Sequence, residues 1–230
     1  MTLRNSVALC VGATTVMAGV CLGAASGKPT MTSSKLLRPG APLVAKPSTR
    51  SPEATEALFR GDMSADLSVG CLPPVGPMES ATKVTATLMP TFGVVSTTYA
   101  IGPGNSGPTW DLVAWNNGAT PGSEIQRCPL GQANGTGGIH TVAVPPGCLT
   151  IPAGAGQTFF FGLSQGTDTN GMMFGMDNDG ATPNTVFVRN PNCGLPNFAP
   201  VEAIGFPGYW VHRIIVDDTV PVELLSFDVR

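Results

Sequence analysis

Charged side chains are scarce in this chain of 230 residues, and basic side chains are especially rare from Gly61 onward. Lys, Arg, Asp and Glu make up 12% of the residues, about half of their usual share. This shortage disfavours a cytosolic enzyme with a surface rich in Lys and Glu. From Gly61 onward there are five basic and thirteen acidic residues. Such an acidic body lacks the positive surface that binds nucleic acid, so we do not expect a nucleic-acid partner.

Long helical segments and internal repeats are also missing. The chain has 29 Gly and 22 Pro, and no segment between them has the length and period of a helix. A large helical protein is therefore disfavoured. No repeat recurs at a fixed interval, which argues against a propeller or a solenoid.

The N-terminal segment lacks an apolar run long enough to span a membrane. The run from Val7 to Leu22 falls short of the roughly 18–20 strongly apolar residues that a spanning helix needs. It follows a basic residue and precedes small ones, so we expect residues 1–26 to be a signal peptide and the mature chain to have no membrane span. Residues 27–65, rich in Pro, Ser, Thr and Lys, are expected to form a disordered linker, with helix-forming residues only at 52–60.

Short apolar and β-branched runs recur from residue 83 onward, between turn sequences rich in Gly, Pro, Asn and Asp. This pattern predicts an all-β fold, an antiparallel β-sandwich of jelly-roll type, with residues 66–230 as a single domain. The predicted strands are 83–89, 92–99, 110–116, 123–127, 139–144, 148–151, 157–164, 172–176, 184–189, 209–216 and 222–229.

Four cysteines follow the predicted signal peptide: Cys71, Cys128, Cys148 and Cys193. The chain has no Cys-x-x-Cys pair, and neither histidine has the spacing of a zinc ligand. An even number of cysteines in an exported chain predicts disulfides, with three pairings open. Cys128 and Cys148 flank a Gly-rich loop between two predicted strands that could be neighbours. We favour this pair, and with it Cys71–Cys193.

One short motif is typical of catalysis. Residues 162–166, GLSQG, match the nucleophile elbow of serine hydrolases, and Asp177 or Asp179 and then His212 follow in the order of those enzymes. The elbow requires a helix after the serine, whereas a turn sequence follows Ser164. We therefore interpret the motif as a strand that ends in a loop, and we assign no catalytic residue.

The loop Asp177-Asn178-Asp179-Gly180 is a candidate metal site. Ca²⁺ binds several oxygen ligands, and two carboxylates beside an amide on a tight loop provide them, with Asp168 as a further ligand. The loop matches only the first part of an EF-hand, since no Glu stands at the twelfth position. The same residues suit an Asx-rich β-turn. We favour the turn, with Ca²⁺ as the alternative and no other cofactor.

Trp110, Trp115 and Tyr209 are candidates for a platform that stacks on sugar rings, because flat aromatic faces complement the apolar faces of carbohydrates. Along 209–216, strand alternation puts Trp210 and Tyr209 on opposite faces, and we favour core packing for Trp210. A sugar ligand requires an exposed aromatic row.

Three segments resemble parts of exported bacterial β-sandwich modules. They are a strand with Asn-Gly and Pro-Gly turns at 110–125, an aromatic strand with an Asp-x-Asp-Gly loop at 157–180, and a closing strand with Trp and Arg at 204–216. The resemblance covers about residues 80–230. It implies a jelly-roll-like accessory module of the kind found in secreted or surface multi-domain proteins, where such modules are not catalytic.

These observations lead to three hypotheses in order of preference. The first is a secreted, non-catalytic β-sandwich module with an interaction or structural role at or outside the cell surface, whose partner the sequence does not identify. The second is a carbohydrate-binding module with a calcium-ordered loop and a glycan partner. The third is a serine hydrolase that uses Ser164.

Overall fold

The structure, a computed structural model, describes residues 30–35, 55–72, 77–87, 91–102, 109–132, 137–152, 158–165 and 173–217. The predicted signal peptide, Asp168 and the predicted strand at 222–229 lie outside these residues. Where the chain is described, its regular structure consists of strands and two short 3₁₀ helices. No helix in these ranges is long and apolar enough to cross a membrane.

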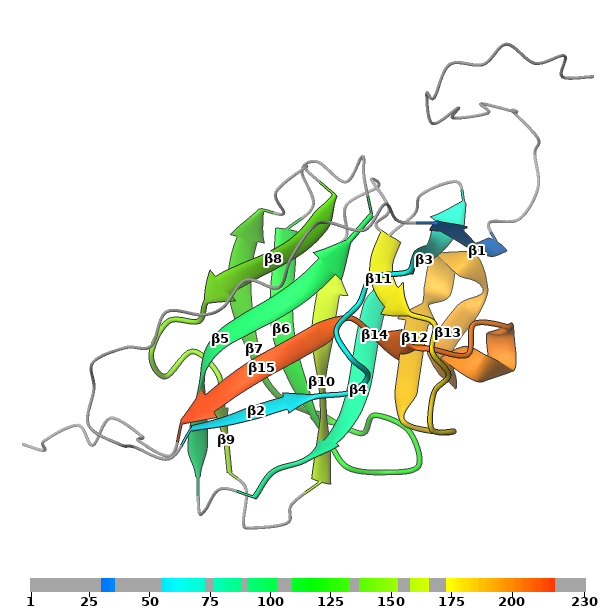
Figure 1. Ribbon diagram of the computed structural model, residues 1–230. Coiled ribbons are helices and arrows are strands. Elements are labelled where there is room, and N and C mark those ends of the chain that lie inside the picture. Colours follow the sequence, from blue (N-terminus) through cyan, green and yellow to red (C-terminus); the bar gives the residue numbers. More distant parts are fainter. Residues whose placement is uncertain are drawn as a thin grey trace, which may run out of the picture.

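The strands form two antiparallel sheets (Figure 1). One sheet has nine strands in the described residues, with β1-β3-β11-β5-β15-β2 as its main order, while β8 and β9 pair with β5 and β14 pairs with β11. Its strands are β1 (Thr30–Lys35), β2 (Thr55–Phe59), β3 (Leu67–Leu72), β5 (Phe92–Ile101), β8 (Gly138–Ala143), β9 (Thr150–Ile151), β11 (Met173–Asp177), β14 (Tyr209–Trp210) and β15 (His212–Asp217).

Within the same ranges, the other sheet has six strands in the order β13-β12-β4-β10-β6-β7. Its strands are β4 (Glu79–Thr85), β6 (Thr109–Asn116), β7 (Glu124–Gln132), β10 (Thr158–Gln165), β12 (Val186–Asn190) and β13 (Leu195–Pro200). In Figure 1, β5, β15 and β2 cross in front of β4, β6 and β10. The chain passes from one sheet to the other after most strands, which explains its need for many Gly- and Pro-containing turns.

The main core lies between the sheets and is rich in aromatic side chains. The rings of Phe92 and Phe159 have centroids 5.8 Å apart, and those of Trp110 and Phe174 lie 5.7 Å apart. Phe161 belongs to the same core. Side chains alternate between the faces of a strand, so every second residue of β10 points into this core.

A smaller hydrophobic cluster lies on the opposite, outer face of the six-stranded sheet. Its buried members, with Phe198 of β13 packed against them, are Ala81, Val113, Trp115, Phe160 and Phe187. β10 is therefore buried on both faces. This explains why its sequence, TFFFGLSQ, is a nearly continuous apolar run and not an alternation of apolar and polar residues.

Two disulfides link elements of different sheets. Cys71 of β3 is bonded to Cys193, in the 3₁₀ turn Pro191–Cys193 that follows β12, and Cys128 of β7 is bonded to Cys148, just before β9. Both pairs agree with the favoured pairing. The reason given for the second pair needs correction, because β7 and the strand after the Gly-rich loop, β8, belong to different sheets.

The predicted antiparallel β-sandwich is confirmed, and most predicted strands are present with shifted ends. The strands predicted at 92–99, 110–116 and 157–164 correspond to β5, β6 and β10. The segment predicted at 209–216 is divided into β14 and β15. The strand predicted at 83–89 begins earlier, as β4 at Glu79.

The predicted linker is wrong in two places. β1 pairs with β3, and β2 pairs with β15 at the edge of the nine-stranded sheet. The sequence of β2, TEALF, contains helix-forming residues, but pairing lets Leu58 enter the main core, and tertiary packing overrides the local preference. β3 and β13 are further strands that the sequence pattern does not predict. β13 contains two prolines, which are tolerated because it is an edge strand.

Candidate functional site

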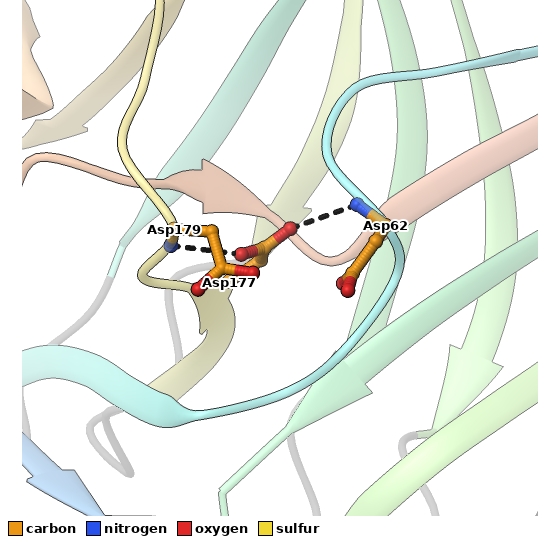
Figure 2. A group of neighbouring side chains, drawn as sticks. All are labelled: Asp62, Asp177 and Asp179. Atoms are coloured by element: carbon orange, nitrogen blue, oxygen red, sulfur yellow. Dashed lines mark hydrogen bonds between the residues drawn. The ribbon is translucent and has the colours of Figure 1, made fainter.

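Three carboxylates converge where the segment after β2 meets the end of β11 (Figure 2). One oxygen from each of Asp62, Asp177 and Asp179 lies within 4.8 Å of the others, with Asp177 buried and the other two exposed. The sequence predicts only the two that belong to the Asp-Asn-Asp-Gly loop. Asp62 lies 115 residues before Asp177, and no local motif marks it, so only the fold brings it into the cluster.

Asp177 joins two segments of the chain. Its Oδ2 accepts a hydrogen bond from the backbone N–H of Asp62 at 2.9 Å, and its Oδ1 accepts one from the N–H of Asp179 at 3.0 Å. The second bond spans two residues and closes an Asx turn. The favoured interpretation of the loop as an Asx-rich turn therefore accounts for the side chain of Asp177.

Two glycines let the backbone approach Asp177 closely. Gly61 has a φ of +72°, and a Cβ there would lie 2.2 Å from Oδ2 of Asp177. A Cβ on Gly208 would lie 2.4 Å from the carbonyl oxygen of Asp177. Only glycine fits at such distances. This close enclosure buries the carboxyl and raises the pKa of Asp177, in opposition to the hydrogen bonds from Asp179 and Asp62, which lower it.

The donor set of the acidic cluster suits a hard divalent cation. Ca²⁺ takes oxygen ligands, and this cluster offers three carboxylates from two segments. Each oxygen of Asp177 already accepts one backbone hydrogen bond, and a carboxylate oxygen retains a second lone pair for another ligand. Asp168, the remaining predicted ligand, lies outside the described residues. The calcium site therefore stays the alternative to the Asx-rich turn, as in the sequence analysis.

A groove of about 360 Å³ lies on the outer face of the six-stranded sheet. Residues of β12, β13 and the β6–β7 hairpin line it, and they include Trp115, Thr120, Glu124, Arg189, Asn197 and Phe198. The rings of Trp115 and Phe198 meet edge to face with centroids 5.4 Å apart, and the guanidinium of Arg189 lies 5.0 Å above the Phe198 ring. The groove thus combines aromatic surface with fixed charges.

Ion pairs cross the same face beside the groove. Strand register puts four polar residues in one row across β12, β4, β10 and β6, namely Arg189, Glu79, Ser164 and Asp111. Two nitrogens of Arg189 contact Glu79. Arg127 pairs with Asp111 and with Glu124, each at 2.7 Å. Hydrogen bonds to Glu124 and Asp111 raise the pKa of Arg127 in spite of its partial burial, so this residue remains charged.

Ser164 and His212 do not come together. Ser164 donates a hydrogen bond to Glu79 Oε1 at 3.1 Å on the outer face of the six-stranded sheet. His212 lies in the interior of the sandwich, 4.6 Å from Phe161 between ring centroids, and its Nε2 lies 3.0 Å from the hydroxyl of Thr97. Since side chains alternate along β10, Phe161 and Ser164 point to opposite faces. His212 therefore does not lie where it could act as the general base for Ser164.

His212 is neutral. The Thr97 hydroxyl donates to the carbonyl oxygen of Arg213 at 3.2 Å, so it accepts its other hydrogen bond from Nε2–H of His212. Nδ1 has no hydrogen-bond partner among the described residues. Burial lowers the pKa of His212 to about 3, which keeps the imidazole uncharged at neutral pH.

The three aromatic residues proposed to contact a sugar lie in different places. Trp110 is 1% exposed and belongs to the main core, so it cannot present a face to a ligand. Trp115 borders the groove on the outer face but is only 3% exposed, so the aromatic surface open to a ligand there belongs mainly to the half-buried Phe198. Tyr209 belongs to β14 of the other sheet, where its hydroxyl accepts a hydrogen bond from the Thr182 N–H at 2.8 Å. They do not form one platform.

The fold and the disulfides define an antiparallel β-sandwich with cross-links between its sheets. The cysteine protease and lectin-like domains of Cwp84, a surface-layer associated protein of Clostridium difficile, have a similar structure, with a TM-score of 0.55 and 9% sequence identity over 76% of this chain and 37% of that chain. The clostridial cysteine protease Cwp84 after propeptide cleavage gives the same TM-score and identity, with 76% of this chain and 42% of that chain covered.

This chain thus spans less than half the length of the solved chains that it matches. At this level of identity the likeness concerns the fold alone. No protein-family model matches the sequence, and the search of curated proteins gives no match.

Proposed function

We propose that this chain is an exported, non-catalytic β-sandwich module with an interaction or structural role at or outside the cell surface. The observation that carries the proposal is the pair of disulfides, Cys71–Cys193 and Cys128–Cys148, which link elements of the two sheets. Disulfides form and persist in oxidising compartments outside the cytosol. A sandwich stabilised in this way is suited to an extracellular environment.

Two further observations support the proposal. The candidate nucleophile Ser164 hydrogen-bonds to a carboxylate on the outer face, and His212 lies in the core, an arrangement that supports a role other than serine hydrolysis. The similar solved chains belong to a surface-layer associated protein whose domains include a lectin-like one. A fold likeness that covers 37% of such a chain is what we expect of an accessory module.

Cell fractionation tests the proposal. We expect the full chain, produced in a bacterial host, to be found outside the cytoplasm with an N-terminus near residue 27. Its four remaining cysteines should resist alkylation until a reductant is added. A chain that stays in the cytoplasm with thiols that react at once would overturn the proposal, because neither export nor oxidation would then occur.

Carbohydrate binding is the second candidate function. The groove beside Trp115 and Phe198 favours it, because aromatic surface and fixed polar groups lie together there. The acidic cluster at Asp177 belongs to the other sheet, at the end of β11. A calcium-ordered loop and a sugar groove are therefore two separate hypotheses, and each needs its own test.

A further inference from the structure

We propose that the groove on the outer face of the six-stranded sheet binds an uncharged sugar residue of a saccharide. This inference rests on the proposed role of the chain as an extracellular interaction module, and it names the ligand class of one site on that module. The groove is formed by the end of β6, the loop that follows it, β12 and β13. It therefore depends on strand pairing across the sheet and not on one flexible loop.

The size of the groove suits a small ligand. Its volume of about 360 Å³ lies in the lower part of the range of roughly 300–1,000 Å³ that is typical of small-molecule sites. A stable protein–protein interface needs roughly 800 Å² from each partner, which is far more surface than this hollow offers. One or two sugar rings are therefore a better match than a folded protein partner.

The charges around the groove balance. Among the residues that the structure describes, the carboxylates of this face belong to Glu79, Asp111 and Glu124, and its cations are Arg127, Arg189 and Lys83. An excess of cations would favour phosphate or a polyanion, and an excess of carboxylates would favour a cation. The balance of three against three favours a ligand that carries no charge but forms many hydrogen bonds.

The polar groups of the groove are held in place by partners outside it. Glu79 binds two nitrogens of Arg189, and Arg127 donates to both oxygens of Glu124, at 3.1 and 2.7 Å. The side chains of Arg189 and Glu124 are each 40% exposed. A guanidinium has five N–H donors and a carboxylate about four acceptor positions, so both retain capacity for a ligand. Fixed planar donors and acceptors suit the adjacent hydroxyls of a sugar ring.

Apolar surface completes the site. Phe198 is half-buried and packs edge to face with Trp115, so it offers part of its ring to the C–H groups of a sugar. Asn197 and Thr120 are exposed at the same groove. They add an amide and a hydroxyl, which form further hydrogen bonds with hydroxyl groups.

Affinity electrophoresis of the oxidised, exported protein tests the proposal. The gels contain dextran, mannan or xyloglucan as uncharged polysaccharides, and polygalacturonate as a charged one. We expect at least one uncharged polysaccharide to retard the wild-type protein. Asn197→Ala and Phe198→Ala should each weaken this retardation at least tenfold. Asn117→Ala, an exposed asparagine on the neighbouring hairpin loop outside the groove lining, should leave it unchanged.

Three results would overturn the proposal: no retardation by any uncharged polysaccharide, retardation by polygalacturonate alone, or retardation that both groove variants retain. Asn197 is exposed, so its substitution does not endanger the fold, and equal unfolding temperatures of wild type and variant check this point. Failure of the proposed function is recognised separately, by a cytoplasmic protein with reactive thiols. An exported and oxidised protein that binds no sugar contradicts only the groove proposal.

Discussion

The two faces of the six-stranded sheet are built from the same strands but differ in chemistry. Toward the nine-stranded sheet, β10 presents Phe161 to the main core, where the ring meets His212. On the opposite side it presents Phe160, which lies 5.4 Å from the ammonium group of Lys83, and Ser164, which binds Glu79. The inner face packs against a second sheet, whereas the outer face carries charges among its aromatic rings.

This difference shows how each face accommodates polar groups. The inner face accepts an imidazole only in its neutral form, because burial lowers the pKa of His212 to about 3. The outer face pairs its carboxylates with guanidinium groups that remain in contact with water. Groups available to a ligand are therefore concentrated on the outer face, while the inner face supplies stability through apolar burial.

The largest expected effect is a loss of stability when an aromatic ring of β10 is truncated, and its size should differ between the two faces of that strand. Phe161→Ala should lower the free energy of unfolding by about 4 kcal/mol and Phe160→Ala by about 3 kcal/mol, since truncation of a buried Phe costs about 3–5 kcal/mol and less where the site can relax. Both rings are fully buried, but the void left by Phe160 can be filled by the side chain of Lys83. Urea unfolding midpoints at constant slope measure the difference. A larger loss for Phe160→Ala would contradict the comparison.

The outer face has its own structural centre at Glu79. Glu79→Gln should lower the free energy of unfolding by about 2–3 kcal/mol, below the ~3–5 kcal/mol of a fully buried ion pair, because its partners are partly exposed. The side chains of Arg127 and Arg189 are 34% and 40% exposed, against 7% for Glu79. The matched control is Asp111→Asn, which should cost about 0.5 kcal/mol, since Arg127 keeps Glu124. Equal losses for the two variants would show that Glu79 has no special role.

The inner face should make stability depend on pH. The pKa of His212 is about 3 in the folded chain and about 6.5 when unfolded. The unfolded state therefore binds the extra proton between these values. The contribution of neutral His212 to the free energy of unfolding is fully present well above pH 6.5, and it is lost as the pH decreases toward 3. Between pH 6.5 and pH 5 the loss should be about 2 kcal/mol, at ~1.4 kcal/mol per unit.

Two variants isolate this contribution. In His212→Gln, the free energy of unfolding should change less with pH than in the wild type, when each protein is compared with its own value at pH 7. His140→Gln, which alters the partly exposed histidine on β8, should leave the wild-type slope in place. Chemical denaturation at pH 7, 6 and 5 supplies the slopes. If His212→Gln retains the wild-type slope, then His212 is not the group that titrates.

The sequence predicts the inner face better than the outer one. Aromatic and β-branched runs, such as TFFFGL in β10 and WDLVAW in β6, identify strands because their side chains are buried wherever the strands pair. The same runs, with an even number of cysteines, are enough to predict a disulfide-linked sandwich. β2 could not be predicted in this way, because TEALF becomes a strand only through its pairing with β15.

The candidate sites depend on contacts between distant segments, which a local pattern does not reveal. Trp115 was identified as a ligand aromatic, but its partners in the groove come from β12 and β13, and their register relative to β6 is a property of the whole sheet. Asp62 joins Asp177 and Asp179 only because Gly61 permits a close approach after β2. Trp110 has the same residue type as Trp115 but packs on the opposite face of the sheet, since the two are five positions apart and side chains alternate along a strand.

The smallest expected effect concerns the acidic cluster, where the carboxylate of Asp177 is stabilised by backbone N–H groups and, among the described residues, not by a cationic side chain. The outer face uses arginines for this purpose, whereas Asp177 receives backbone N–H groups from Asp62 and Asp179. Three carboxylates within 4.8 Å repel one another, and a divalent cation would relieve that repulsion. In the alternative interpretation, in which the cluster binds Ca²⁺, 10 mM Ca²⁺ should stabilise the protein by about 1.4 kcal/mol at a dissociation constant of about 1 mM, which is typical of extracellular calcium modules.

Thermal unfolding in CaCl₂, MgCl₂ and EDTA measures this effect. A gain of about 1.4 kcal/mol corresponds to a rise of roughly 2–4 °C in the midpoint for a domain of this size. Asp179→Asn removes one exposed carboxylate from the cluster and should reduce the calcium-dependent rise to less than half. Asp111→Asn removes a carboxylate from the outer face and should leave it intact. An identical midpoint in CaCl₂ and EDTA would mean that backbone N–H groups alone balance Asp177, and that the loop is an Asx turn without a metal.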